Sequence, residues 1–338
     1  MPIVPNPVLR GFHPDPSIVR VGDDYYIATS TFEWWPGVAI AHSRDLVHWR
    51  TVRPAITRVS QLDLRGRPNS GGVWAPALSH ADGLFHLIYT DVRGWTGEFK
   101  DVRNYLVTAK DIEGPWSEPV HLNNSGFDPS LFHDDDGRKW LVNMVWDHRP
   151  GHNSFGGILL QEYDPSARAL VGPIHNIFRG TPLGLVEGPH LYHVDGWYYL
   201  LVAEGGTFAT HAATVARSRR IEGPYQPMPD GPLLTSAHDP SLRLQSAGHG
   251  SLVQHADGRW SLAHLCRRPL PNGRSILGRE TALQDIAWVD GWPRLAHGTR
   301  TPADHFTAPD LPPHPWPAVP ERDDFDAPEL GPHWQSPR

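Results

Sequence analysis

Short runs of alternating apolar and polar residues recur along most of this chain, and they come in pairs around a turn. In five places a turn-forming triplet precedes such a run, a Gly/Asp turn follows, and a second, aromatic-rich run ends the unit. Alternation predicts half-buried strands, and the central turns predict β-hairpins. The copies recur at intervals of roughly 60 residues and read DPSIVRVGDDYYIATS, APALSHADGLFHLIYT, DPSLFHDDDGRKWLVN, GPHLYHVDGWYYLLVA and HGSLVQHADGRWSLAH.

A second pair of strand-like runs follows each copy, for example VAIAHSRDLVHWRTV after the first. Two strands before and two after give four-stranded units, and five copies at a fixed period are typical of a radial array of small sheets. We therefore predict an all-β fold, a five-bladed β-propeller of four-stranded antiparallel blades. The alternatives, a parallel β-helix or a sandwich, repeat at shorter spacing.

Composition narrows the class of partner. Of 338 residues 39% are hydrophobic, the net charge is −7, and no run of basic residues is present, so we expect no nucleic-acid partner. No apolar stretch is long enough to span a membrane, and the N-terminus lacks the pattern of a secretion signal. With the single Cys266, these features predict a cytoplasmic protein.

The aromatic content is high, with 14 Trp residues. Aromatic faces stack on the apolar faces of sugars, although blade cores also use such side chains. After residue 296 the repeated strand pattern ends, and residues 301–320 are rich in proline. We predict a propeller domain over 1–300 and, over 301–338, an extended linker and a short segment with too few residues to bury a core of its own.

The starts of the copies place unusual side chains around one mouth of the propeller channel, because innermost strands line that channel. These side chains are Asp15, Trp74, Asp128, Glu187 and His249. Two carboxyl groups suit glycosidic bond cleavage, one as general acid and one as general base. A third can raise the pKa of the acid by like-charge repulsion. Structural turn acids and a cation site remain alternatives at this point.

Eight motifs in order then resemble glycoside hydrolase family 43, most closely its β-xylosidase branch. They are GFHPDPSI, STFEWWPGVAI, SGGVWAPALS, SGFDPSLFHDDDGRKWLVNM, WDHRPGHNSFGG, EGPHLY, AGHGSLV and LGRETAL, and the resemblance runs from about Asn6 to Leu295. It implies a five-bladed propeller, in agreement with the repeat count.

The resemblance also implies roles. Asp15 matches the general base, Asp128 the carboxylate that modulates pKa and orients the acid, and Glu187 the general acid of an inverting single displacement. Inversion requires the carboxyl groups of base and acid to lie roughly 6.5–9.5 Å apart, which leaves room for a water.

Four further residues are implied as supporting groups. Arg279 is expected to contact sugar hydroxyls and steady Asp128, the alternative being a surface ion pair with Glu280. Trp74 and Phe32 are expected to wall the pocket of the terminal sugar, with core packing as the alternative for Phe32.

The fourth, His249, resembles an axial imidazole that helps to hold a calcium or other divalent cation, largely coordinated by water, in the central channel. The alternative is a buried histidine without a metal. No cofactor is required for the chemistry, since acid, base and water suffice.

The implied activity is release of D-xylose from the non-reducing ends of β-1,4-xylo-oligosaccharides. An α-L-arabinofuranosidase or an enzyme with both activities is the main alternative, and a non-catalytic carbohydrate-binding propeller is a less favoured one. In this branch a β-sandwich usually follows the propeller, and residues 322–338 resemble its opening strand. We therefore expect an exposed apolar docking patch, and a homo-oligomer or a separate β-sandwich chain as partner.

Two other patterns have simpler explanations. His148 and His152 could pass for a metal pair, but their Gly/Pro-rich segment lacks further ligands and is interpreted as a pocket-rim loop. The run Asp134 to Gly137 resembles half a calcium loop and is better explained as the hairpin turn of the third blade.

Overall fold

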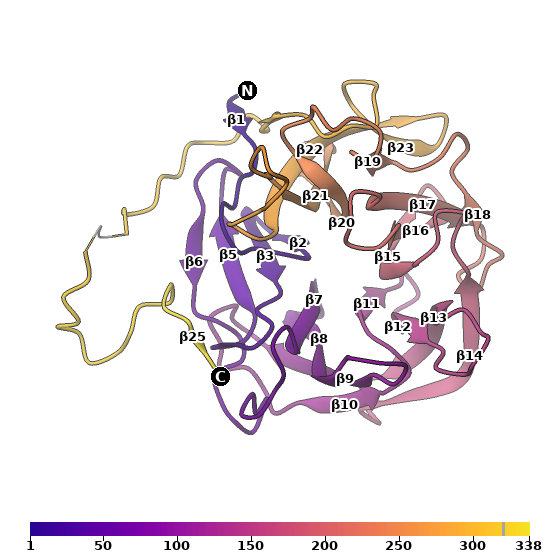
Figure 1. The fold of residues 1–338 in the computed structure, drawn as a ribbon, viewed down its shortest axis with the longest axis horizontal. Helices are drawn as coiled ribbons and strands as arrows, with labels where there is room; N and C mark the ends of the chain where they lie inside the picture. The colour runs from indigo at the N-terminus through magenta and orange to yellow at the C-terminus, as the bar shows by residue number, and fades with distance from the viewer. Residues whose placement is uncertain (320–321) are drawn as a thin grey trace.

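The computed structural model describes residues 1–319 and 322–338, and within these ranges it contains strands and no α-helix. Five antiparallel sheets are arranged in a ring around a central channel, as Figure 1 shows. The predicted five-bladed β-propeller is therefore confirmed, and the β-helix and the sandwich are excluded.

Each blade is formed by one sequence copy and the pair of strands that follows it. Blade 1 comprises β2 (Ser17–Val21), β3 (Asp24–Thr29), β5 (Ala39–Ser43) and β6 (Arg50–Val52); blade 2 comprises β7 (Gly72–Ala81), β8 (Leu84–Gly94), β9 (Asp101–Ala109) and β10 (Val120–Asn123); blade 3 comprises β11 (Ser130–His133), β12 (Lys139–Trp146), β13 (Phe155–Asp164) and β14 (Ala169–Phe178). Blade 4 comprises β15 (Glu187–Val194), β16 (Trp197–Glu204), β17 (Ala212–Ser218) and β18 (Gln226–Pro227), with β19 (Leu234–Thr235) also on β17; blade 5 comprises β20 (Gln245–Gln254), β21 (Trp260–Arg267), β22 (Glu280–Val289) and β23 (Trp292–Leu295).

Apolar side chains fill the spaces between neighbouring blades. One buried cluster joins blades 1 and 2, from Tyr26 and Ile40 to Leu87 and Trp116, and others join blades 3 and 4 and blades 4 and 5. This packing explains the pattern of apolar and polar residues in each copy, because both faces of a blade pack against neighbouring blades while its turns reach solvent.

Side-chain hydrogen bonds connect the innermost strands of all five blades in sequence. In three of them a backbone amide donates to a hydroxyl: Leu78 to Ser17 Oγ (3.0 Å), Leu252 to Tyr192 OH (2.8 Å) and Ile18 to Ser251 Oγ (3.2 Å). In the other two, Ser130 Oγ donates to the Pro189 carbonyl (2.6 Å), and Ser79 Oγ bonds His133 Nε2 (2.9 Å). Three of these serines stand third in a repeated triplet, so the triplet supplies the contact between blades as well as a turn.

The N-terminal segment closes the ring by pairing with blade 5. Leu9 and Thr281 exchange backbone hydrogen bonds of 3.1 Å, and the Asn6 side chain bonds both the amide and the carbonyl of Leu283. Further out, β1 (Ile3–Pro5) pairs with β24 (His305–Thr307). This closure brings residues 13–15 beside Arg279, whose carbonyl accepts the His13 amide at 2.9 Å.

The chain after blade 5 stays on the propeller for some distance. Phe306 and Ala308 are fully buried against blades 1 and 5, and the Trp316 ring lies 4.8 Å from that of His42. Near the C-terminus, β25 (Ser336–Pro337) returns to the edge of blade 1, where Figure 1 places it, and it pairs with β4 (Trp34–Trp35).

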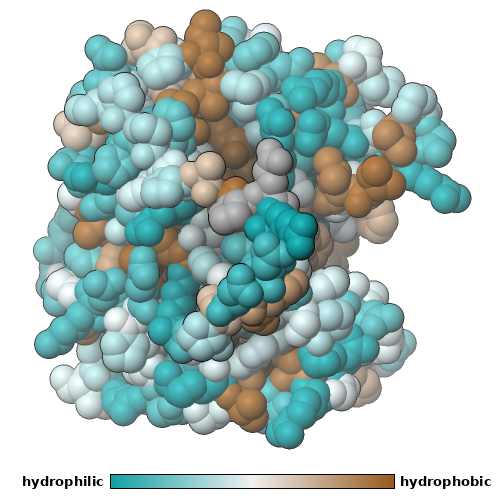
Figure 2. Space-filling model, turned by 90° about the vertical axis from the view of Figure 1, so that its left-hand side faces the viewer, coloured by the Kyte–Doolittle hydropathy of each residue, from teal (hydrophilic) through white to brown (hydrophobic). Residues whose placement is uncertain are grey.

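The domain division at residue 300 stays a prediction. The structure adds that residues 305–316, although extended, pack against blades 1 and 5. Residues 320–321 of the predicted linker and further domain lie outside the described residues. On this side of the molecule hydrophobic residues form separate patches between hydrophilic ones (Figure 2). None of the described residues forms a helix of the length and hydropathy needed to cross a bilayer.

Candidate active site

The first residue of every repeated triplet has a left-handed backbone conformation, and this shared conformation directs side chains of all five copies toward the channel mouth. The φ angles are 56° at Asp15, 33° at Ala75, 53° at Asp128, 58° at Gly188 and 42° at His249. A left-handed residue at the entry of a strand bends the chain, and in blades 2, 4 and 5 the ladder shows a bulge there. Bulges of this kind re-aim side chains, here toward the channel mouth.

The side chains converge on a cavity of about 490 Å³ at that mouth. All seven residues predicted from the sequence line it: Asp15, Phe32, Trp74, Asp128, Glu187, His249 and Arg279. All five blades contribute, through their strands or through the residues just before or between them, so the convergence is a property of the ring and not of any local motif.

Asp15 is held as a carboxylate by donors on both oxygens. Ser30 Oγ donates to Oδ2 at 2.6 Å, and Arg279 Nη1 donates to Oδ1 at 2.6 Å. Burial alone would raise the pKa of Asp15, but Arg279, His249 and the Ser30 hydroxyl together bring the pKa below its usual value. An ionised, immobilised carboxylate is suited to take a proton from water.

Glu187 has the opposite electrostatic setting. Its burial, and next the negative charge of Asp15, raise the pKa of Glu187 to about 8, against the opposing cations Arg279 and Lys100. Its carboxyl group is therefore protonated at neutral pH and can act as a proton donor.

Asp128 lies beside this acid. The Gly188 amide, next to Glu187 in the chain, donates to Asp128 Oδ2 at 3.1 Å. Burial and then the charges of Glu187 and Asp15 raise the pKa of Asp128 well above its usual value. This contact ties Asp128 to the backbone that carries Glu187, which is the geometry expected of an orienting carboxylate.

Arg279 differs from the sequence expectation in its partner. It was expected to steady Asp128, but it forms its ion pair with Asp15, because the N-terminal segment runs along the start of β22. The alternative pair with Glu280 is also absent among the described residues, since Glu280 is bonded by Arg268 at 2.7 Å. The Arg279 guanidinium also lies 5.1 Å from the centre of the Phe32 ring.

The two predicted aromatic walls lie in the cavity. The Trp74 ring is 6.3 Å from Phe32 and 5.4 Å, edge-on, from Phe127, and its indole donates to the Ser70 carbonyl at 2.7 Å. Phe32 is buried but lines the cavity and also has a left-handed backbone. Both rings thus have fixed positions, as stacking on a sugar ring requires.

His249 is buried and lines the cavity, with Nδ1 3.9 Å from Asp15 Oδ1, and burial lowers its pKa. Calcium prefers about six to eight oxygen ligands. Near His249 the structure offers the Asp15 carboxylate, whose oxygens already accept from Ser30 and Arg279. This donor set fits a resident calcium ion poorly, so the water-coordinated cation stays a prediction and no chemical step below depends on it.

Sequence reasoning missed much of the cavity wall. Trp95, Lys100, Phe127, Trp146, Phe155, Leu185, Thr207 and Phe208 also line it. Lys100 Nζ donates to the Trp95 carbonyl at 2.9 Å and lies 4.1 Å from the Trp146 ring centre, and burial lowers the pKa of Lys100. The only sequence signal for this wall was the loop interpreted as a pocket rim, which Trp146 and Phe155 flank.

The remaining candidates lie elsewhere. Asp134 to Gly137 form the turn between β11 and β12, as predicted. In that turn Asp134 and Asp135 come close to His193, with ligand atoms within 4.8 Å of one another. His152 lies 3.4 Å from Asp147 in the rim loop.

Comparison with known proteins agrees with the geometry. The model of "Glycosyl hydrolases family 43" matches residues 4–293. A xylosidase/arabinosidase 43B of Humicola insolens is 62% identical over 86% of this chain and 54% of its own length, and a beta-xylosidase of Bacillus subtilis (strain 168) is 54% identical over 98% and 64%. The crystal structure of xylan beta-1,4-xylosidase from Bacillus halodurans C-125 superposes with a TM-score of 0.97 at 63% identity, over 98% of this chain and 64% of that one. The chain thus spans between about half and two thirds of the length of these relatives.

Proposed function

Since the chain belongs to glycosyl hydrolase family 43, we propose that it is an exo-acting, inverting β-xylosidase that releases D-xylose from the non-reducing ends of β-1,4-xylo-oligosaccharides. The observation that carries this proposal is the opposite electrostatic setting of two carboxyl groups in one cavity. Asp15 has a lowered pKa, and Glu187 has a pKa raised to about 8. Such a separated pair supplies a base and an acid at the same pH.

The reaction follows from these two states. A water between Asp15 and the anomeric carbon gives its proton to the Asp15 carboxylate as its oxygen attacks. Glu187 donates its proton to the glycosidic oxygen, which leaves with the aglycone. Attack opposite the leaving group inverts the anomeric carbon, and the two carboxyl groups then end with exchanged protonation states.

The surrounding residues keep this arrangement in place. Arg279 and Ser30 hold both Asp15 oxygens, so the base cannot rotate away from the water. Asp128, bonded to the Gly188 amide, orients the backbone that carries the acid. Trp74 and Phe32 supply apolar walls for one sugar ring, which suits a terminal residue better than an internal one.

A second activity, α-L-arabinofuranosidase, is supported by the relatives, because some are named for xylosidase activity, some for arabinofuranosidase activity and some for both. One example is the non-reducing end alpha-L-arabinofuranosidase BoGH43B of Bacteroides ovatus, which is 38% identical over 97% of this chain. Xylopyranose and arabinofuranose can present similar hydroxyl and leaving-group positions to one trio of carboxyl groups. The cytoplasmic location, the oligomeric state and a separate β-sandwich partner stay predictions from the sequence.

The test uses 4-nitrophenyl β-D-xylopyranoside, 4-nitrophenyl α-L-arabinofuranoside and xylobiose as substrates. We expect hydrolysis of xylobiose, a higher kcat/KM on the xyloside than on the arabinoside, and α-xylose as the first product seen by proton NMR. Asp15→Ala is the inactive control. First release of β-xylose would overturn the inverting mechanism, and a higher rate on the arabinoside would select the second activity.

A further inference from the structure

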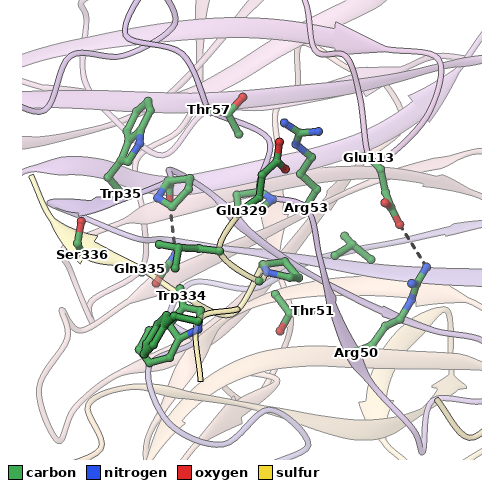
Figure 3. A pocket seen from close by; sticks show the side chains of 17 residues that line it. Trp35, Arg50, Thr51, Arg53, Thr57, Glu113, Glu329, Trp334, Gln335 and Ser336 are labelled. Atoms are coloured by element: carbon green, nitrogen blue, oxygen red, sulfur yellow. Dashed lines mark hydrogen bonds and ion pairs between the residues drawn. The ribbon is translucent and has the colours of Figure 1, made fainter. Parts of the chain in front are cut away.

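Residues 335–338, here called the tail strand, attach to the segment that carries one wall of the cavity. Ser336 pairs with Trp35 and Pro337 with Trp34, and the Arg338 amide donates to the Glu33 carbonyl at 2.9 Å. Gln335 Nε2 donates to the Pro36 carbonyl at 3.2 Å, a bond drawn in Figure 3. A cavity of about 620 Å³ is lined by Phe325, residues 329–332 and 334–336 on one side, and by residues 35–36, 50–54 and 57 of the propeller on the other.

The segment that receives the tail strand holds, in turn, a tight turn at residues 69–73. Phe32 and Val73 exchange backbone hydrogen bonds of 3.0 and 2.9 Å, and the Ser70 amide donates to Glu33 Oε2 at 3.0 Å. The approach is close, because a side chain at Gly72 would collide with the Phe32 carbonyl. Movement of residues 32–33 is therefore transmitted to the turn.

This turn positions two indole rings of the active-site cavity. The Asn69 carbonyl accepts from Trp95 Nε1 at 3.0 Å, and the Ser70 carbonyl accepts from Trp74 Nε1 at 2.7 Å. Both rings line the cavity and lie 6.3 Å from each other. The tail strand reaches the same turn directly, since Arg338 Nη2 donates to Asn69 Oδ1 at 3.0 Å.

We propose that the tail strand is a positioning element for substrate binding, which acts through Glu33 and Asn69 to fix the Trp74 and Trp95 indoles. The turn is held by Glu33 on one side and Arg338 on the other, so loss of either contact lets the two rings tilt away from the sugar. The acid and the base are on other elements; Asp15 reaches the strand after this turn indirectly, through Ser30 Oγ, which accepts from the Ala75 amide at 2.7 Å, and its second oxygen is held by Arg279. The effect therefore falls on KM more than on kcat. This inference rests on the proposed function for its kinetic readout.

Four variants test the contact chain. Arg338→Ala removes the bond to Asn69, and Glu33→Ala removes the bond to the Ser70 amide, whereas Glu33→Gln keeps an oxygen acceptor for that amide. Arg322→Ala is the matched control. Arg322 is an arginine of the same C-terminal segment, before the tail strand, but it pairs with Asp324 at 2.5 Å and lines neither cavity. The readouts are kcat and KM for 4-nitrophenyl β-D-xylopyranoside and hydrogen exchange of the amides in residues 69–73.

The expected results are specific to the chain of contacts. Arg338→Ala and Glu33→Ala raise KM by roughly two- to fivefold, the scale of one solvent-exposed charged contact, with kcat changed by less than about twofold. Exchange of the turn amides accelerates in both, Glu33→Gln restores most of the original KM, and Arg322→Ala matches the parent. Unchanged KM in both alanine variants, or an equal change in Arg322→Ala, would overturn the proposal.

The two proposals fail in distinguishable ways. If the parent protein hydrolyses neither glycoside, the proposed function fails, and hydrogen exchange alone decides the positioning role. Faster exchange at residues 69–73 in Arg338→Ala but not in Arg322→Ala supports it. Unchanged exchange refutes it, whatever the activity.

Discussion

At the start of the repeated hairpins, Asp15, Asp128 and Glu187 are buried together, whereas at the turn end, between blades 2 and 3, the buried His86 lies beside the half-buried His133. The rings of the two histidines lie 4.8 Å apart, and neither Nδ1 has a hydrogen-bond partner among residues 1–319 and 322–338. Burial lowers the pKa of His86 to about 4 and that of His133 to about 3.

Both ends therefore contain strongly perturbed pKa values, and this property alone does not distinguish a site from a core. What distinguishes them is access and convergence. The acids line a cavity of about 490 Å³ to which all five blades contribute, while the histidines line none of the cavities described. Five experiments test this contrast between the two ends.

The largest difference is expected within blade 4. Glu187→Ala removes the proton donor and should lower kcat on xylobiose by about 10²- to 10⁴-fold, the usual contribution of a general acid. The loss should be smaller on 4-nitrophenyl xyloside, whose leaving group needs less protonation. Asp195→Ala, at the turn of the same blade, should keep the parent kcat. Equal losses from both substitutions would contradict the contrast.

The second difference concerns the ion pairs at the two ends. Arg279→Gln leaves the burial of Asp15 opposed by His249, Ser30 and His211 without the guanidinium, so the pKa of Asp15 rises. We expect the acidic limb of the kcat/KM profile, where the base becomes protonated, to move to higher pH than in the parent. Lys139→Gln removes the cation that bonds Asp82 at 2.6 Å at the turn end. The pH profile of this control should match that of the parent.

Much of this arrangement could be predicted from the sequence, for a physical reason. The alternation of Ser17 to Thr29 and its four counterparts is required by strands packed on two faces, so the blades follow from local pattern. The positions of Asp15 and Glu187 in the repeat then place them at one mouth. The partner of Arg279 could not be predicted this way, because it depends on how residues 1–14 close the ring 264 residues away in sequence.

The wall formed by Trp95, Trp146 and Phe208 was also beyond sequence reasoning. These residues lie in or beside loops whose paths are set by contacts between blades, such as the Trp146 indole bond to the Glu98 carbonyl at 2.7 Å. No periodicity marks such positions.

The third experiment is the pH dependence of activity. Glu187 must be protonated to act, and its pKa of about 8 means that the proton is lost as pH rises through that value. We expect kcat/KM to be flat near pH 6–7 and to fall about tenfold per pH unit well above 8. The residual activity of Glu187→Ala should lack this limb. A limb that persists in the variant would assign the titration to another group.

The fourth experiment concerns stability at the turn end, where the pH dependence has the opposite sense. His86 and His133 have lowered folded-state pKa values and ordinary values near 6.5 when unfolded. The unfolded chain therefore binds protons first, and stability falls as pH decreases from about 6.5 toward 4, by on the order of 1.4 kcal/mol per unit of pKa difference. Lys139 and Asp82 face the pair with opposite charges.

Urea unfolding at pH 7.5, 6 and 5 measures this slope, and His86→Gln should reduce it without removing it. Other buried histidines, including His211 and His264, contribute in the same direction because burial lowers their pKa values too. Glu187 and Asp128, whose pKa values are raised, change the stability in the opposite direction over this range, so the difference between the parent and His86→Gln isolates the imidazole. Equal slopes in the two proteins would show that the His86 imidazole is already solvated in the folded state.

The smallest expected effect concerns backbone strain, because left-handed residues occur both at the start of the repeated hairpins and in their turns. Gly83, at φ 70° in the turn of blade 2, has open space around it, so Gly83→Ala adds only backbone strain and should cost about 1–2 kcal/mol. Ala75, at φ 33° where the same blade begins, already bears such strain. Ala75→Gly relieves it but loosens the unfolded chain by about 0.4–1 kcal/mol, so the net change should be near zero. Thermal unfolding of the two variants compares them directly. If Ala75→Gly destabilises as much as Gly83→Ala, the side chain at the start of blade 2 contributes packing that its conformation does not reveal.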